Sequence, residues 1–531
     1  MVVMLLIACA EGPDTAQVEV APAEITALDW LNRASVDVRA RRPSEAEIAL
    51  VEADPEALPG LLDDFVADPA FALRLLTVYN EVLRTKTDQY LVSLDNSVQF
   101  LDEDYNLAFR HAVGEEPERI IWYIAENDLP WTDVVLADYT VANDIMFEHL
   151  PLSDLDGGEG WRRARYVDDR PVGGVLVTNG MWWRYTSTFE NANRGRAQAV
   201  ARSFLCDDRF EAAVSFQGAT ESLDERTSTD PTCVSCHASL DPLAAYFWGF
   251  MLRNQEAWLE AIQYNAAFES GWVSETGVGP GYYGAAGTSM AGLGDQIAAD
   301  PRFVNCAVET GMRAFVGDTF RMESAAEFSS HREAFLAGGL TLRALYRSLL
   351  DNPRYRQAER DDEPVTAPRL MRVDQRAGTI QALTGFEWTW GGNAMLDVDE
   401  GGVRVLAGGV DGLIATEPSV EPSTTTVLVQ ERLAEAAAQY AVATEGPIGA
   451  SERTLFREID LYDAAPTDDA LATQITALLL RAHGRRHAPG DDEVQSLVEL
   501  WHTLAAAGGS PNEAWEDVLS GIFRHPDFVT Y

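Results

Sequence analysis

The chain has 531 residues, of which 46% are hydrophobic and 23% are charged, a balance typical of a soluble globular protein with several units. Its 84 acidic residues outnumber its 40 basic residues, so the formal net charge is −44. This charge argues against a surface that binds nucleic acid, and against docking on anionic lipid through basic patches. It suits a basic redox partner or other basic protein, although an acidic surface also serves solubility alone.

At the start of the chain, an apolar run over residues 1–8 is followed by Cys9. The stretch Leu6-Ile7-Ala8-Cys9 resembles a bacterial lipobox, so we expect residues 1–20 to be a lipoprotein signal and tether, with Cys9 as the lipidated residue. The body would then be exported, to the periplasm or the cell surface, and would meet the outer membrane only through its lipid. The alternative is an incidental cysteine, because the basic opening of a secretory signal is missing.

Most of the remaining chain shows the apolar spacing of three and four residues that predicts helices. The clearest segments are Leu58–Val66, Ala197–Leu205, Leu342–Leu350, Val427–Ala441 and Val494–Ala507. Strand-like alternation is rare, and its best example is Val403–Leu406 between two pairs of glycines. The fold class predicted is therefore mainly α, a multi-unit helical body with minor β structure in the C-terminal region.

Breaks rich in Gly, Asp or Pro divide the chain into predicted domains. They are an N-terminal helical domain at 21–153, a central module at 160–275, a helical module at 288–360, and a C-terminal helical domain with a short β segment at 368–531.

A short phrase recurs at predicted helix ends, in which proline is followed after one residue by an aromatic residue. It occurs at Asp68–Phe71, Asp300–Phe303, Asn352–Tyr355 and His525–Phe528. Proline cannot continue a helix and disfavours the helical conformation in the residue before it. We therefore expect each phrase to end a helix, within recurrent helical hairpins of about forty residues. The alternative is an ordinary helix stop that recurs by chance.

One motif carries chemistry, Cys233-Val234-Ser235-Cys236-His237. Two thiols with this spacing can bond the two vinyl groups of one haem, and the next histidine can coordinate its iron. The cofactor predicted is one covalent haem c, attached to Cys233 and Cys236, with His237 as the axial iron ligand. A thioredoxin-like pair would need a strand–helix context, and a zinc site would need further ligands nearby.

The second axial ligand decides the chemistry of such a haem, and Met181 is the first candidate because it lies in a segment rich in Gly and Trp upstream of the motif. Arg184, Arg194 and Arg196 are candidates for contacts with the haem propionates. The alternatives are core packing for the methionine and ordinary ion pairs for the arginines.

Further cysteines and histidines leave alternatives open. Cys206 and Cys306 either form a disulfide in an oxidising compartment or are separate buried thiols. His483 and His487 lie four residues apart, a spacing that metals use, but the arginines and proline around them favour a solvated helix end.

Several stretches in order give the chain a resemblance to planctomycete-type multi-domain haem-c proteins, which also occur in myxobacteria. The residues that carry it are Ala137–Asn143, Gly173–Thr178, Arg194-Gly195, Cys206, Cys233–His237 with Ser239–Leu243, Ala299–Cys306, Gly317, Leu340–Tyr355 and Leu406–Asp411. The resemblance implies a cytochrome c-like module around the motif and a redox role in the periplasm or at the outer membrane, but no substrate. Trp248 and Gly249 depart from its pattern, which puts partner contacts in doubt more than haem attachment.

Three functions follow as hypotheses. The leading one is electron transfer by an exported mono-haem cytochrome lipoprotein, which requires no catalysis. The second is a haem peroxidase or oxidase-like enzyme with an open distal site. The third is a scaffold in which haem has a structural or sensory role.

Overall fold

The protein is seen in a computed structural model, which describes residues 24–90, 103–185, 193–211, 229–250, 264–317, 325–357, 369–399 and 401–531. Cys9 and the predicted signal and tether lie outside these residues. The described chain is mainly helical, and all five segments with the clearest helical spacing form helices. None of the described helices has the length and apolar character needed to cross a membrane.

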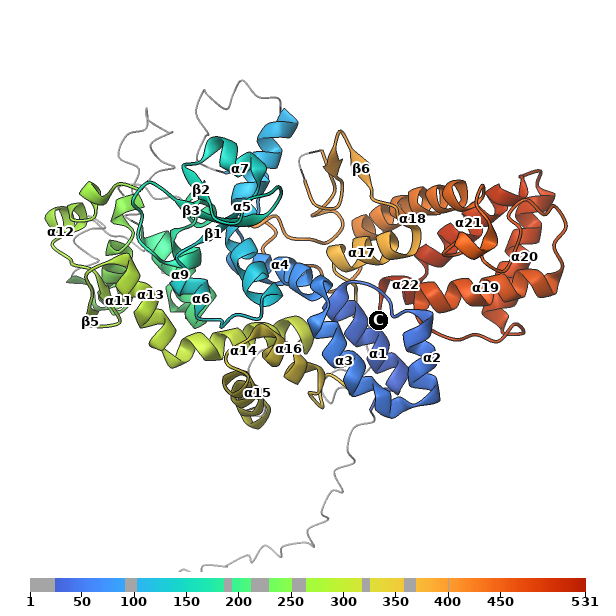
Figure 1. The fold of residues 1–531 in the computed structure, drawn as a ribbon, viewed down its shortest axis with the longest axis horizontal. Helices are drawn as coiled ribbons and strands as arrows, with labels where there is room; N and C mark the ends of the chain where they lie inside the picture. The colour runs from blue at the N-terminus through green and yellow to red at the C-terminus, as the bar shows by residue number, and fades with distance from the viewer. Residues whose placement is uncertain are drawn as a thin grey trace, which may run out of the picture.

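The first two thirds of the chain contribute most of one large core (Figure 1). Its longer helices are α1 (Ala27–Arg39), α2 (Glu45–Ala53), α3 (Leu58–Ala67), α4 (Pro69–Leu83), α5 (Glu103–Glu126), α9 (Arg194–Leu205), α11 (Pro231–Ala245), α13 (Met290–Ala299), α14 (Pro301–Phe315), α15 (Ala325–Ala337) and α16 (Leu342–Leu350). Shorter helices are α6 (Asp133–Leu136), α7 (Asp144–His149), α8 (Asn179–Arg184) and α12 (Gly271–Thr276). The predicted units at 21–153, 160–275 and 288–360 all place side chains in this core.

The end of the chain forms a second core, which lies beside the first in Figure 1. It is built from α17 (Val373–Thr384), α18 (Thr424–Glu445), α19 (Asp468–His483), α20 (Asp492–Ala506), α21 (Pro511–Arg524) and α22 (Pro526–Val529). Trp501 and Trp515 are among its largest buried side chains. After α22 the chain returns to the first core, where the Tyr531 hydroxyl donates a hydrogen bond to Asp37 of α1.

The described β structure is small. Strands β1 (Thr140–Ala142), β3 (Arg162–Tyr166) and β2 (Leu152–Asp154) form an antiparallel sheet in that order. Two short hairpins are β4 (Gly281–Tyr282) with β5 (Ala285–Ala286), and β6 (Thr389–Trp390) with β7 (Asn393–Ala394). The strand predicted at Val403–Leu406 is wrong: this segment forms tight turns, in which the Ala407 and Gly408 N–H groups bond to the carbonyls of Val403 and Val405. The glycine pairs on either side of Val403–Leu406 therefore lie in turns, and the segment between them is a turn as well.

The recurring proline phrase ends helices, as predicted, and in three cases it also begins the next helix. Asp68 lies between α3 and α4, Asp300 between α13 and α14, and His525 between α21 and α22. In each case the side chain before proline accepts a hydrogen bond from the backbone N–H two residues later. The following aromatic residue is buried at all four phrases, with exposed fractions of 1% or less at Phe71, Phe303, Tyr355 and Phe528.

Arg42, in the turn between α1 and α2, joins the two cores. Its Nε donates to the carbonyl of Ala482 over 3.0 Å, and its Nη2 donates to the carbonyls of Asp527, Phe528 and Thr530 over 2.7–3.0 Å. Its Nη1 donates to the side-chain oxygen of Asn32 over 3.0 Å. Burial lowers the pKa of Arg42 to about 9, so it stays charged at neutral pH. One buried cation thus supplies hydrogen bonds to three carbonyls near the end of the chain.

We expect Arg42→Met to lower the free energy of unfolding by about 3 kcal/mol or more, because buried carbonyls lose donors that water cannot replace. Denaturant unfolding followed by circular dichroism measures this loss. The matched control is Arg432→Met, which removes an exposed arginine that pairs with Glu435 and should cost less than about 0.5 kcal/mol. Equal losses in the two variants would contradict the role assigned to Arg42.

Candidate functional site

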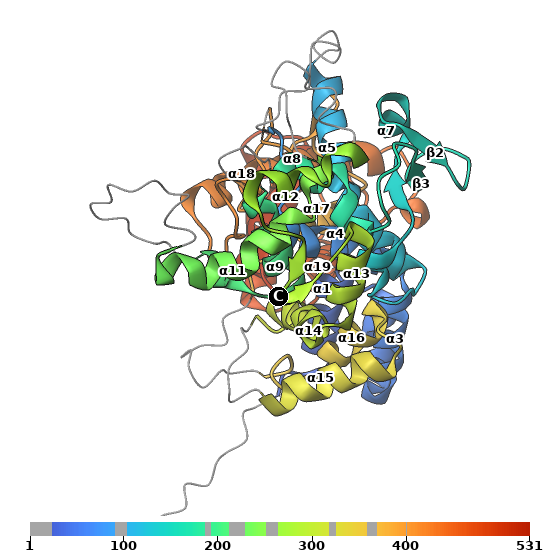
Figure 2. The ribbon, with the colours of Figure 1, turned by 90° about the vertical axis from the view of Figure 1, so that its left-hand side faces the viewer.

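The Cys-Val-Ser-Cys-His motif lies in the first two turns of α11. Asp230 caps this helix by accepting a hydrogen bond from the Thr232 N–H over 2.9 Å, and Pro231 occupies the first turn, where its missing N–H costs nothing. Positions three and four apart share one face of a helix. Cys233, Cys236 and His237 therefore present their side chains on one side of α11, which Figure 2 shows at the edge of the described ribbon beside α9.

The two thiols of the motif are free and differ in exposure. Cys233 is 9% exposed, while Cys236 is half-buried. The other two described cysteines, Cys206 and Cys306, are bonded to each other in a disulfide that joins the end of α9 to α14. The pairing that the sequence left open is therefore present in the structure, and the motif thiols take no part in it.

His237 is held by a carboxylate one turn further along the same helix. Its Nδ1 lies 2.9 Å from Oδ1 of Asp241. A carboxylate only accepts hydrogen bonds, so Nδ1 carries the proton and Nε2 of the neutral ring keeps its lone pair. This tautomer is the one in which a histidine offers Nε2 to a metal, with the other ring nitrogen fixed by an acceptor.

Arg194 holds the same carboxylate from the neighbouring helix α9. Its Nε donates to Oδ1 of Asp241 over 2.7 Å, and its Nη2 donates to Oδ2 over 3.2 Å. Burial alone would raise the pKa of Asp241, but the hydrogen bonds from His237 and Arg194 outweigh it and lower that pKa. Asp241 is therefore an anion at neutral pH, and α9 and α11 are joined at the point where His237 is oriented.

The other arginines predicted near a haem have protein partners in the described structure. Arg184 donates to the carbonyl of Gly412. Arg196 is buried, donates to the carbonyls of Tyr185, Phe250 and Trp182, and packs over the Trp182 ring. These contacts give both side chains a structural role, whereas Arg194 contacts the partner of His237. Contacts of Arg184, Arg194 and Arg196 with haem propionates stay a prediction.

Met181 is buried in the first core, where α8 packs against α5. The adjacent Trp182 stacks on Phe250 with ring centroids 4.2 Å apart, and both rings are buried. These aromatic residues therefore fill core next to the end of α11. Met181 as a distal ligand stays a prediction, because no described contact joins it to His237.

A feature that the sequence analysis missed is a cavity of about 650 Å³ between the two cores. It is lined by Lys86, the only lysine in the chain, which lies 2.6 Å from both Glu115 and Asp397. Glu118 lines it too, and accepts a hydrogen bond from the Thr85 hydroxyl over 2.7 Å at Oε1. The single lysine was a signal in the sequence, but its partner Asp397 is 311 residues away.

Comparisons of this chain with protein-family models, with curated proteins and with solved structures gave no significant match. The candidate site is therefore argued from its own geometry.

Glu118 should make the protein less stable as the pH rises. Burial raises its pKa to about 8, so the folded state keeps a proton that the unfolded state releases near pH 4.5. Between these values the folded state binds more protons, and its stability falls by up to about 1.4 kcal/mol per pH unit. Glu118→Gln should remove this loss, so its melting temperature should fall less than that of the wild type from pH 5 to pH 8.

The matched control is Glu56→Gln at an exposed position in the turn before α3, which should follow the wild type at every pH. Parallel melting curves for Glu118→Gln and the wild type over this range would show that Glu118 is ionised in the folded protein.

Proposed function

We propose that this chain is an exported cytochrome that carries one haem c on α11 and transfers electrons to or from a protein partner. Cys233 and Cys236 would bond the haem, and His237 would coordinate its iron. The observation that carries the proposal is the single helix face on which two free thiols stand beside a histidine whose Nδ1 is already committed to Asp241.

The thiols and the imidazole of the motif fit the requirements of a haem c. Haem attachment needs two reduced thiols with two residues between them and a neutral imidazole directly after the second. Both thiols are free, and the tautomer fixed by Asp241 leaves Nε2 as the ligand atom. The bound haem would supply one-electron redox chemistry.

The chain's own residues contribute orientation and charge. Asp241 fixes the plane and tautomer of the His237 ring, and Arg194 fixes Asp241 from α9. A carboxylate on the second ring nitrogen makes a histidine a more basic ligand and so favours oxidised iron. Arg194 moderates this effect, because its positive charge lies on the same carboxylate.

The disulfide favours an exported protein, and export in turn is what the attachment of a haem c would require. Disulfides persist in oxidising compartments such as the bacterial periplasm. The Cys206–Cys306 bond and the lipobox-like Leu6–Cys9 segment therefore favour the same destination, with a lipid on Cys9 as the membrane anchor. In this compartment a net charge of −44 favours a basic redox partner through complementary electrostatics.

The His237–Asp241 pair also favours a second candidate function, a peroxidase or oxidase-like enzyme with an open distal site. A more basic proximal histidine lends electron density to iron, which suits the activation of bound ligands as well as low-potential transfer. Electron transfer remains the first choice because it requires neither a substrate site nor a catalytic step.

Haem attachment is tested by expressing the full chain in a bacterium that assembles c-type cytochromes. We expect a pigment that resists acidified acetone and gives the pyridine haemochrome spectrum of thioether-bonded haem. The Cys233→Ala/Cys236→Ala variant should lose the covalent pigment, and the control Ser235→Ala, between the two thiols, should keep it. A colourless wild type, or pigment that acid acetone extracts, would overturn the proposal.

The spectrum of the purified ferric protein separates the two candidate functions. Low-spin, six-coordinate iron supports electron transfer, and high-spin, five-coordinate iron supports catalysis at an open site. If iron is low-spin and Met181→Ala converts it to high-spin, Met181 is the distal ligand.

Asp241→Asn should raise the reduction potential of the haem, because the variant keeps the shape of the acceptor and removes its charge. We expect a rise on the order of 60 mV, which corresponds to a tenfold change in the equilibrium constant of a one-electron couple. Spectroelectrochemical titration measures it. The control is Asp230→Asn, which alters the cap of the same helix without contacting His237. An unchanged potential in Asp241→Asn would show that this carboxylate does not act on the iron ligand.

A further inference from the structure

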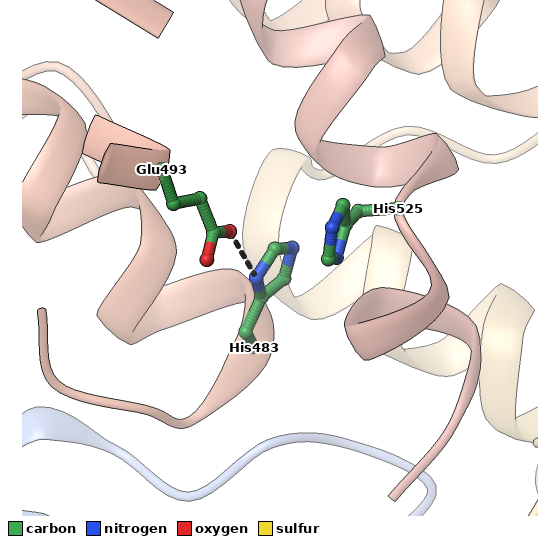
Figure 3. A group of neighbouring side chains, drawn as sticks. All are labelled: His483, Glu493 and His525. Atoms are coloured by element: carbon green, nitrogen blue, oxygen red, sulfur yellow. Dashed lines mark ion pairs between the residues drawn. The ribbon is translucent and has the colours of Figure 1, made fainter. Parts of the chain in front are cut away.

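Two histidines and a glutamate from separate helices meet in the second core (Figure 3). His483 is the last residue of α19, Glu493 lies in the first turn of α20, and His525 stands between α21 and α22. One potential ligand atom from each residue lies within 4.8 Å of those of the other two. The prediction of a solvated helix end here is wrong for His483, which is 1% exposed. The reason is that α21 and α22 pack over the end of α19.

His483 presents a nitrogen lone pair inside this cluster that no hydrogen-bond donor contacts. Its Nε2 lies 3.0 Å from the carbonyl oxygen of Ile522, which only accepts, so Nε2 carries the proton. Nδ1 of the neutral ring is then an acceptor, and it is buried without a hydrogen-bond partner. Burial lowers the pKa of His483 to about 4, which keeps the ring neutral.

A second acceptor, the carboxylate of Glu493, faces this lone pair. Oε1 of Glu493 lies 3.9 Å from Nδ1 of His483, along the dashed line of Figure 3. A carboxylate and an unprotonated nitrogen cannot form a hydrogen bond with each other. A buried acceptor that faces a half-buried carboxylate is unfavourable unless a cation lies between them. Ligand atoms around a tetrahedral zinc ion, with bonds of about 2.0–2.1 Å, lie about 3.3 Å apart, close to this separation.

His525 completes the set from the other side. Its ring faces that of His483, with centroids 5.2 Å apart and planes 22° from parallel. Since a metal lies in the plane of each imidazole that binds it, the His525 ring must turn to share an ion with His483. Its side chain is 42% exposed, which leaves room for a rotation, and the rotation gives up the hydrogen bond that its Nδ1 accepts from the Asp527 N–H over 3.2 Å.

We propose that His483, Glu493 and His525 bind a divalent transition-metal ion, with Zn²⁺ as the best match. Two imidazoles and one carboxylate are a ligand set that zinc uses, and they leave one coordination position. His487 lies near the glutamate, since its Nδ1 is 3.7 Å from Oε2 of Glu493, and its Nε2 is buried without a hydrogen-bond partner. The ion would tie α19, α20 and the α21–α22 corner together, and so stabilise the second core.

The test uses the full-length chain with Cys233→Ser and Cys236→Ser, so that the motif thiols cannot capture zinc. After dialysis against a chelator, calorimetric titration with ZnCl₂ should give one site with a dissociation constant below about 1 µM. The melting temperature should rise with the concentration of free Zn²⁺, because the ion binds only the folded protein. Co²⁺, used as a probe, should give the intense visible absorption of a four-coordinate site.

Glu493→Gln and His525→Ala, both at partly exposed positions, should each weaken Zn²⁺ binding at least tenfold and remove the rise in melting temperature. The control is His502→Ala, an exposed histidine on α20 that pairs with Asp468, and it should bind like the parent. Failure of the parent chain to bind Zn²⁺ would overturn the proposal. So would binding that both Glu493→Gln and His525→Ala retain. Because this site is independent of α11, either result leaves the haem proposal untouched.

Discussion

The packing of the two helical cores against each other depends on cationic side chains that are removed from water and that each donate hydrogen bonds to several oxygens. Arg42 is the clearest case, since three carbonyls near the end of the chain share its guanidinium group with Asn32 and Ala482. Lys86 plays a similar part, because it bridges Glu115 of α5 to Asp397 near β7. In a chain with net charge −44, each buried cation also reduces the repulsion among acidic side chains. Burying these cations costs desolvation free energy, and leaving one of them without its oxygen partners costs more. They therefore favour one arrangement of the cores.

The two histidine sites obey the same rule of hydrogen bonding. In each, one ring nitrogen is bound to an oxygen that only accepts, namely the Asp241 carboxylate for His237 and the Ile522 carbonyl for His483. The other nitrogen is thereby left with a lone pair for a metal. The sites differ in their anions, because Asp241 is neutralised by Arg194 behind the ring, while Glu493 faces the open nitrogen itself. The first arrangement would tune His237 as the proposed iron ligand, and the second would be completed by the proposed cation.

The difference between these sites also explains what the sequence could predict. Cys233, Cys236 and His237 are neighbours on one helix, so their spacing alone indicates a shared face, and the Asp230-Pro231 cap confirms where that helix begins. The proline phrases were equally local, and they end helices where predicted. The proposed ligands of the second site are separated by up to 42 residues along the chain, from His483 to His525, and the packing of α21 on α19 brings them together. His483 and His487, four residues apart, do not share a helix face, because Gly484 ends α19 in a left-handed conformation.

The same reasoning explains the strand that was wrongly predicted and the contacts that were missed. Glycine pairs around Val403–Leu406 are compatible with a hairpin or with successive turns, and Arg404 decides for turns by bonding to Asp88 and Asp399. Asp88 lies 316 residues away in the chain, so no local pattern contains that information. In a chain with a single lysine, long-range partners of this kind are almost all arginines, whose planar donors satisfy several oxygens at once. Buried arginines at turns, such as Arg42 and Arg404, therefore fix long-range contacts whose partners cannot be predicted from the neighbouring sequence.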